Sequence, residues 1–329
     1  MARHVGIFAI LGVFVAIGPT RTLRLDAQEN LQSYLASLTG ARRGSAIIIK
    51  PASGELLAAW NLRKAVEDAY PPGSTAKIVL SAAALEESLT MPAERLICQR
   101  VPPLLGSAYV CAHPPAPEGF TLSSALANSC NFFFVELSMR ENAETLLHWY
   151  SVFGFGAAAE LDGRPTAAGE VRKPSDERSK ALAALGEENV VSTAAQLLEA
   201  YVLVANHGTE YGLWTNRVRQ RRPTPHRCVH LRSSTYAALT AGLMGCVRVG
   251  TCQAAAVPGV QVAGKTGTSS ALDGSGATHA WFVGFAPADR PEIALVVFLE
   301  RGTGAHNAAP LAGKLLRYYF ADIKSRPSQ

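Results

Sequence analysis

Stretches with the composition of β-strands lie at both ends of this 329-residue chain, and Ala- and Leu-rich stretches with helical spacing lie between them. The early pair, "SAIIIK" and "LLAAWNL", is separated by the turn "PASGE" and is typical of a β-hairpin. Three late strands are predicted at "VQVAGKTGTS", "HAWFVGFAP" and "EIALVVFLE", followed by an amphipathic helix. If they pair with the hairpin, a five-stranded antiparallel sheet forms and the helical block is an insertion. We therefore expect an α/β (α+β) fold.

The N-terminus combines a basic lead-in with a short apolar run. Arg3 and His4 precede the fourteen apolar residues 5–18, which are too few to span a bilayer comfortably but suit a secretory signal. Ala27 offers a cleavage point, and an uncleaved membrane anchor stays open. The chain then divides into a signal peptide or anchor, a short linker and one domain: 1–27, 28–44 and 45–329. We expect export to the periplasm or the outer face of the bacterial inner membrane.

Charge and composition narrow the function classes. Hydrophobic residues make up 48% and charged residues 17% of the chain, which favours a globular protein over a disordered one. Much of the net charge of +5 lies in "NRVRQRRPTPHR" at 216–227. In an exported protein such a run is read as a solvated loop, so we expect no nucleic-acid partner.

Six cysteines occur in the chain, and an oxidising compartment would allow some of them to pair. Cys98 and Cys111 flank one loop, and Cys246 and Cys252 flank another, so we expect these two local disulfides, although sequence alone does not fix connectivity. There is no CxxC and no His/Cys spacing suited to zinc. We expect neither a metal nor a cofactor.

The stretch "YPPGSTAKIV" places Ser74 and Lys77 at the start of a helix, after a Pro-Pro-Gly turn. Residues three apart share a helix face, so the amine can reach the serine oxygen. A serine needs a base to become a nucleophile, and a partly desolvated lysine can be that base. Free N–H groups at the helix start favour an oxyanion. Alone, this pair fits a capping serine beside a surface lysine better than a catalytic pair.

Two more motifs follow. In "NSCN", Ser129 and Asn131 flank Cys130, and from a loop both can point into one cleft as a proton relay and an amide contact. The central cysteine is expected to pack away from the cleft. In "GKTGTS", the glycines leave room for a ligand backbone against a strand, and Lys265 and the two threonines offer groups for a carboxylate.

Together, S-x-x-K at a helix start, S-x-N in a loop and K-T-G on a strand resemble the transpeptidase domain of penicillin-binding proteins, most closely the class B branch. The resemblance covers about residues 45–320, and "YSVFGFG" and "HAWFVGFAPAD" add to it. It implies the β-lactamase/transpeptidase-like fold, with helices flanking the sheet and an inserted all-helical subdomain. It also implies D,D-peptidase chemistry on peptidoglycan stem peptides ending in D-Ala-D-Ala, with β-lactam antibiotics as trapping mimics.

The resemblance implies a role for each motif residue. Ser74 attacks the penultimate D-alanine carbonyl, Lys77 accepts the serine proton, and Ser129 relays it to the leaving D-alanine. Asn131 contacts the substrate amide. The other substrate-binding residues lie along one strand: Lys265, Thr266, Gly267 and Thr268. The backbone N–H groups of Ser74 and Thr268 form the oxyanion hole. An amine acceptor makes a transpeptidase, and water makes a carboxypeptidase.

Departures from the family pattern keep rival functions open. The family's "GQG" appears here as "GEE" at 186–188, so Glu187 or Glu188 could by residue type activate water in a β-lactamase. Asn131 argues against a class D-like enzyme, whose middle motif usually ends in valine. A non-catalytic β-lactam sensor or wall-binding module is a further rival. Only 28–43 precede the first strand, so we expect no long N-terminal module, and the sequence does not identify a protein partner.

Overall fold

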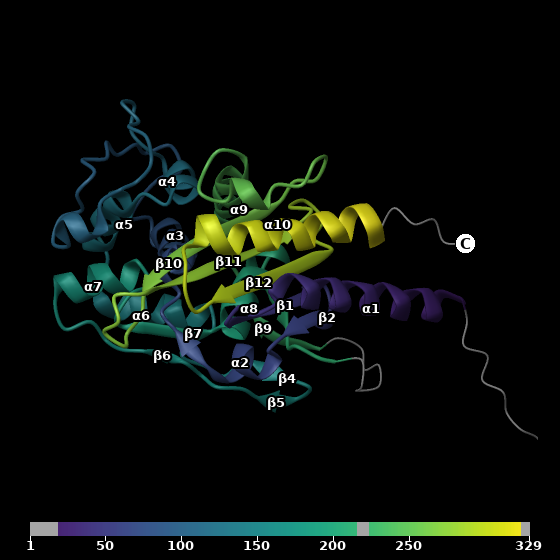
Figure 1. The fold of residues 1–329 in the computed structure, drawn as a ribbon. Helices are drawn as coiled ribbons and strands as arrows, with labels where there is room; N and C mark the ends of the chain where they lie inside the picture. The colour runs from purple at the N-terminus through teal and green to yellow at the C-terminus, as the bar shows by residue number, and fades with distance from the viewer. Residues whose placement is uncertain (1–18, 216–223, 324–329) are drawn as a thin grey trace, which may run out of the picture.

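The computed structural model describes residues 19–215 and 224–323, and its centre is a five-stranded antiparallel sheet (Figure 1). The strand order is β10-β11-β12-β1-β2. The five strands are β1 (Gly44–Lys50), β2 (Glu55–Trp60), β10 (Ala263–Ser270), β11 (Thr278–Ala286) and β12 (Ile293–Leu299). β1 pairs with β12 in a register that joins Gly44 to Leu299. The predicted pairing of the late strands with the early hairpin is therefore confirmed.

The sheet separates two hydrophobic cores because side chains alternate between its faces. Ile47 and Ile49 of β1 belong to the core shared with the helical part of the chain, whereas Ile48 belongs to the core on the opposite face. α1 (Pro19–Thr39) and α10 (Ala309–Tyr318) cover that opposite face, and α8 (Ala194–Ala205) covers the first (Figure 1). Both faces are buried, so the strands are nearly continuous apolar runs.

The helical block between β2 and β10 is the predicted insertion. Its helices are α2 (Leu62–Glu67), α3 (Lys77–Glu86), α4 (Leu122–Asn128), α5 (Asn131–Met139), α6 (Ala143–Val152), α7 (Glu177–Ala184), α8 and α9 (Ser233–Arg248). Short strands join it: β3 (Ala69–Tyr70), β4 (Glu160–Leu161), β5 (Arg164–Pro165), β6 (Glu170–Val171), β7 (Val190–Thr193), β8 (Thr209–Tyr211) and β9 (Pro225–Cys228). Thr193 caps α8 in a reciprocal box with Gln196, which fixes where that helix begins.

The segment predicted as a linker contains packed helix. Residues 28–39 form the second half of α1, and Leu31 and Leu35 are buried in the core beneath it. Gln32 accepts a hydrogen bond from the Ala59 N–H at 2.9 Å and donates to the Ala59 carbonyl at 3.0 Å. α1 thereby covers the exposed edge of β2. The apolar periodicity of this helix is weak, which is why its packing was not evident from the sequence.

Two sequence predictions fall on residues outside the described ranges. The apolar run 5–18 lies there, and so does most of the basic run that was read as a solvated loop, at 216–223. Across residues 19–215 and 224–323, no helix combines the length and the apolar character needed to cross a membrane.

The cysteine predictions divide. The disulfide between Cys246 and Cys252 is confirmed. The predicted pair of Cys98 and Cys111 is wrong, since both thiols are free. Cys111 is instead directed to Cys130, and the two sulfurs are 3.9 Å apart.

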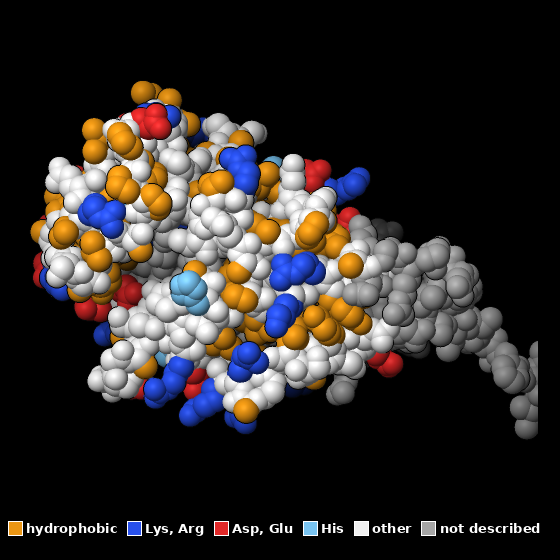
Figure 2. Space-filling view, turned by 45° about the horizontal axis from the view of Figure 1, so that its top comes forward, with side chains coloured by type: hydrophobic (Ala, Val, Ile, Leu, Met, Phe, Trp, Pro, Cys, Tyr) orange, Lys and Arg blue, Asp and Glu red, His pale blue; other side chains and the backbone are white. Residues whose placement is uncertain are grey.

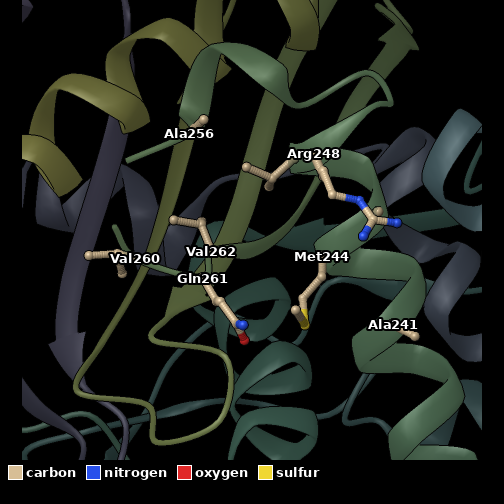
Figure 3. A pocket seen from close by; sticks show the side chains of 9 residues that line it. Ala241, Met244, Arg248, Ala256, Val260, Gln261 and Val262 are labelled. Carbon is tan, nitrogen blue, oxygen red and sulfur yellow. The ribbon is translucent and has the colours of Figure 1, made fainter. Parts of the chain in front are cut away.

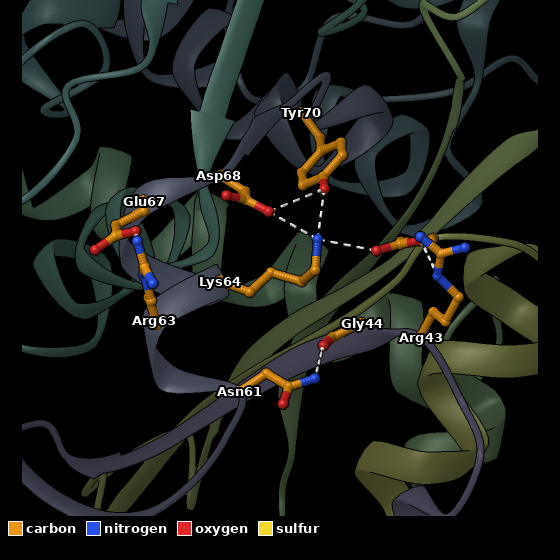
Figure 4. Close-up of polar contacts among 9 residues, drawn as sticks. Arg43, Gly44, Asn61, Arg63, Lys64, Glu67, Asp68 and Tyr70 are labelled. Atoms are coloured by element: carbon orange, nitrogen blue, oxygen red, sulfur yellow. Dashed lines mark hydrogen bonds and ion pairs between the residues drawn. The ribbon is translucent and has the colours of Figure 1, made fainter.

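A polar network at the end of the sheet holds the chain that leads into the nucleophile motif (Figure 4). Lys64 Nζ lies 2.7 Å from Asp68 Oδ2, 2.8 Å from Tyr70 Oη and 2.9 Å from Glu300 Oε1. Burial lowers the Lys64 pKa, but these three hydrogen bonds outweigh it and raise the pKa above its ordinary value. Arg43 completes the network by pairing with Glu300 at 2.8 Å. α2, β3 and the end of β12 are thus joined just before Ser74.

If α1 is part of the folded unit, shortening one of its buried side chains must destabilise the domain. Leu35→Ala should lower the free energy of unfolding by about 2–4 kcal/mol, because a fully buried leucine loses its contacts and leaves a cavity. The measurement is chemical denaturation followed by circular dichroism. Leu272→Ala is the matched control, because Leu272 is 56% exposed and its loss should change stability by less than about 0.5 kcal/mol. Equal effects of the two substitutions would contradict this packing.

Candidate active site

Ser74 stands in a short 3₁₀ turn, Gly73–Ala76, which leads directly into α3. The sheet holds this turn in place through one carbonyl. Pro71 O accepts hydrogen bonds from Ser269 Oγ at 2.6 Å and from Trp281 Nε1 at 2.9 Å, so side chains of both β10 and β11 bind the turn. Two donors on one buried oxygen leave the turn little freedom. The Pro-Pro-Gly stretch therefore presents the serine from a backbone fixed on the sheet.

Glycines permit the turn to approach its neighbours closely. A Cβ on Gly186 would lie 2.2 Å from the Gly73 carbonyl, and the Gly73 N–H donates to the Gly186 carbonyl at 2.9 Å. A Cβ on Gly267 would lie 2.6 Å from the Pro72 carbonyl. The sequence interpretation left the space beside Gly267 for a ligand backbone. In the structure the protein's own turn occupies that space.

Lys77 is fully buried next to Ser129 and Asn131, which line the cleft, and three acceptors hold its amine. Its Nζ donates to Asn131 Oδ1 at 2.6 Å, to the Ser129 carbonyl at 3.0 Å and to Ser129 Oγ at 3.3 Å. Burial lowers the Lys77 pKa to about 8, although Cys130, Cys111 and Glu187 act to raise it. At pH 7 about one tenth of this amine is thus unprotonated, far more than for an exposed lysine.

The helix break between α4 and α5 brings Ser129 and Asn131 to this amine. Ser129 adopts a left-handed conformation with φ of 55° and ends α4, and Asn131 begins α5. Asn131 Nδ2 donates to the Tyr109 carbonyl at 3.0 Å, so its Oδ1 is oriented toward Lys77. Cys130 is buried and does not line the cleft, in accord with its predicted packing role. Within the described ranges, Ser74 Oγ makes no hydrogen bond to Lys77.

Thr266 and Thr268 of β10 line the opposite wall of the cleft, which has a volume of about 460 Å³. Ser74, Ser129 and Asn131 line it as well. Thr268 Oγ1 accepts a hydrogen bond from the Gly304 N–H at 3.0 Å, which leaves its own hydroxyl proton free for a bound anion.

Lys265 does not reach the cleft. It is fully buried, and its Nζ donates to the Thr266 carbonyl at 2.9 Å. Burial and the proximity of Lys77 lower the Lys265 pKa well below its ordinary value. The sequence interpretation placed this cation on the substrate carboxylate, whereas in the structure its amine is buried on a backbone carbonyl, close enough to Lys77 for that cation to lower its pKa.

Two residues outside the three motifs also affect this site: Thr251 lines the cleft, and Glu187 lies near Lys77. Thr251 lies in the loop closed by the Cys246–Cys252 disulfide, and its Oγ1 is 2.6 Å from Thr266 Oγ1. Glu187, named in the sequence as a water-activating group by type only, is buried and accepts the Ser270 N–H at 3.3 Å. Burial raises the Glu187 pKa to about 7. Glu187 does not line the cleft, so its action on the site is electrostatic.

A second hollow, of about 550 Å³, lies between α9 and the approach to β10 (Figure 3). Met244 and Arg248 of α9 face Val260 and Gln261 across it. None of the predicted site residues lines this hollow, and its walls are mainly apolar. On the face in Figure 2, Lys and Arg side chains lie among apolar ones.

The arrangement in the cleft agrees with comparisons to known proteins. The family model described as "Penicillin binding protein transpeptidase domain" matches residues 44–317. The chain belongs to the penicillin-binding protein transpeptidase family.

Individual relatives support this membership. Peptidoglycan D,D-transpeptidase PbpA of Mycobacterium tuberculosis is 30% identical over 276 residues, covering 75% of this chain and 54% of the relative. The chain spans about half the length of this relative. Penicillin-binding protein A from M. tuberculosis, solved as a ceftriaxone acyl-enzyme complex, has a TM-score of 0.72 at 25% identity and covers 91% of this chain and 77% of that one.

The fold also matches more distant family structures. Pseudomonas aeruginosa PBP2, solved in complex with WCK 5153, has a TM-score of 0.75 at 24% identity and covers 91% of this chain and 77% of its own. This likeness confirms the predicted β-lactamase/transpeptidase-like fold.

The contact between Gly186 and the nucleophile turn can be tested with two alanine substitutions. Gly186 and Gly259 both have left-handed backbones, with φ of 76° and 73°, but a Cβ on Gly259 meets open space. Gly259→Ala should cost about 1–2 kcal/mol for the backbone conformation alone. Gly186→Ala should lower the free energy of unfolding by about 1–3 kcal/mol more, because its Cβ overlaps the Gly73 carbonyl. Urea denaturation measures both, and equal losses would show that the turn does not rest on Gly186.

Proposed function

We propose that this chain is a serine D,D-transpeptidase that acts on peptidoglycan stem peptides ending in D-Ala-D-Ala through an acyl-enzyme on Ser74. One observation carries the proposal. Ser74 stands at a helix start in the cleft, and the buried Lys77 one turn further on contacts both Ser129 and Asn131. The names of relatives such as PbpA support the substrate class.

In the acylation step, Ser74 Oγ attacks the penultimate D-alanine carbonyl while its proton passes to neutral Lys77 Nζ. Lys77 Nζ lies 3.3 Å from Ser129 Oγ, so the proton can continue through this hydroxyl to the nitrogen of the departing D-alanine. The C–N bond then breaks and the serine ester remains. The asparagine amide, fixed by the Tyr109 carbonyl and Lys77, contacts the substrate backbone.

The terminal carboxylate of the substrate binds among hydroxyl groups. Thr251, Thr266 and Thr268 all line the cleft on the side of β10. Hydroxyl donors suit a carboxylate, and the buried Lys265 adds positive charge only when it is protonated. Recognition of the D-alanine carboxylate therefore depends on neutral donors more than the sequence motif suggested.

An amine from a neighbouring stem resolves the acyl-enzyme and forms a cross-link. Water in place of the amine would give a carboxypeptidase on the same machinery. The domain, residues 45–329, acts outside the cytoplasm, with residues 1–27 serving as its signal peptide or membrane anchor. β-Lactam antibiotics bind in the cleft as substrate mimics, and the ceftriaxone acyl-enzyme complex of the M. tuberculosis relative supports this part of the proposal.

A fluorescent penicillin tests the nucleophile. The purified protein should retain the label covalently for many minutes, and Ser74→Ala should abolish labelling. Ser81→Ala is the control, because it removes a buried hydroxyl from the same helix. That hydroxyl donates to the Lys77 carbonyl rather than to the Lys77 amine. Rapid hydrolysis of the reporter with little retained label would identify a β-lactamase instead. Labelling that survives Ser74→Ala would exclude the proposed acyl-enzyme.

The pH dependence of labelling tests the base. Neutral Lys77 is the active form, so the acylation rate should rise with pH through about 8, the pKa of this amine. Glu187→Gln removes a carboxylate that raises the Lys77 pKa, so the midpoint should move to lower pH. Glu118→Gln, at an exposed position, should leave the midpoint in place. A profile that falls through this range, or one unaffected by Glu187→Gln, would remove Lys77 from the proposed role.

A further inference from the structure

Three cysteines and a histidine meet beside the cleft. The ligand atoms of Cys98, Cys111, His113 and Cys130 all lie within 4.8 Å of one another, and all of these residues except Cys98 are buried. The sequence analysis expected no metal because it found no short Cys/His spacing. That reasoning overlooked this cluster, since its members come from two loop segments and the N-cap of α5, which the fold brings together.

The imidazole of His113 is oriented as a ligand. Its Nδ1 lies 2.8 Å from the Pro114 carbonyl, an acceptor, so the proton resides on Nδ1 and the lone pair on Nε2. Nε2 is buried and has no hydrogen-bond partner. An unsatisfied buried acceptor of this kind is unfavourable, and a bound metal would satisfy it. The ring is also fixed edge-on against Phe120, with centroids 4.6 Å apart.

The sulfurs have the spacing and the surroundings of metal-bound thiolates. Cys111 Sγ and Cys130 Sγ are 3.9 Å apart, and two sulfurs on a tetrahedral zinc with bonds of about 2.3 Å are separated by about 3.8 Å. Each sulfur accepts a backbone N–H. The donors are Arg100 to Cys98 at 3.3 Å, Phe132 to Cys111 at 3.3 Å and Phe133 to Cys130 at 3.5 Å. Such donors stabilise thiolate charge around a metal.

We infer that Cys98, Cys111, His113 and Cys130 form a tetrahedral site for Zn²⁺. Three thiolates and one imidazole are a complete ligand set for structural zinc, and they exclude magnesium and calcium, which take oxygen ligands. A disulfide between any two of the sulfurs would leave the third thiol and Nε2 without a shared partner. The zinc site satisfies all four groups at once.

The site would connect the 98–113 loop to the S-x-N motif. Cys130 lies between Ser129 and Asn131, and the same loop supplies the Tyr109 carbonyl that accepts from Asn131 Nδ2 at 3.0 Å. Arg100 ties the loop to itself by donating to the Cys111 and His113 carbonyls, at 2.8 and 3.0 Å. Zinc therefore positions Ser129 and Asn131 without touching substrate, which goes beyond the proposed acyl transfer.

The test is the metal content of the untagged full chain, purified without chelator and measured by plasma mass spectrometry. One zinc per chain is expected, together with a tetrahedral cobalt spectrum carrying thiolate charge-transfer bands after cobalt replacement. Cys98→Ser and His113→Gln should each weaken zinc affinity by at least about 100-fold in chelator competition, since even outer partners of a ligand contribute about 10- to 100-fold. Cys228→Ser, at an exposed free cysteine, should leave affinity unchanged.

A thiol count distinguishes the remaining outcomes. After unfolding with chelator and no reductant, the zinc protein should show four reactive thiols, since two of the six cysteines form the Cys246–Cys252 disulfide. Two thiols and no zinc would mean a disulfide within the cluster and would overturn the inference. Four thiols with no zinc, even after zinc is added, would overturn it too. If His113→Gln fails to fold, the test still stands on Cys98→Ser, which changes a half-exposed residue, and on the cobalt spectrum of the wild-type protein. No substrate is used, so the result does not depend on the proposed acyl transfer.

Discussion

The attachment of the Pro71–Gly73 turn to the sheet is the contact on which the rest of the active site depends. One carbonyl, that of Pro71, accepts from both Ser269 and Trp281, and the turn rests on glycines at 186 and 267 that cannot carry a side chain. Ser74 follows this turn, Lys77 begins the next helix, and α3 carries the core of the helical part. The position of the nucleophile relative to β10 is therefore set by backbone contacts rather than by the catalytic side chains.

Burial then supplies the chemistry. Lys77 and Lys265 are both fully buried, and removal from water lowers the pKa of each. Glu187 is also buried with a raised pKa, so it opposes the shift of Lys77 only in so far as it is ionised. Lys77 and Glu187 each change the pKa of the other, and Lys77 also lowers the pKa of Lys265. The site is arranged to keep an amine available as a base near neutral pH.

The sequence predicted the sheet and the inserted helices correctly because both are encoded by local periodicity, in β1, β12 and α8 for example. The motif residues Ser74, Lys77, Ser129, Asn131, Thr266 and Thr268 were found from short spacings, and the fold brings them together. The burial of Lys265 was not predictable, because strand alternation does not say which face meets another cation. Thr251, the packed half of α1 and the Cys98–Cys111–His113–Cys130 cluster depend on contacts between distant segments, which leave no periodic signal.

The helix α1 gives the sheet two unlike borders. Gln32 satisfies both backbone groups of Ala59, so at this point the outer edge of β2 has no free pairing groups to offer another chain. The other border, β10, faces the cleft through Thr266 and Thr268. Under the proposed function, an extended substrate therefore lies at the β10 border, which is also the border beside the nucleophile. At Ala59, the contact with α1 protects the opposite border against edge-to-edge pairing with another copy.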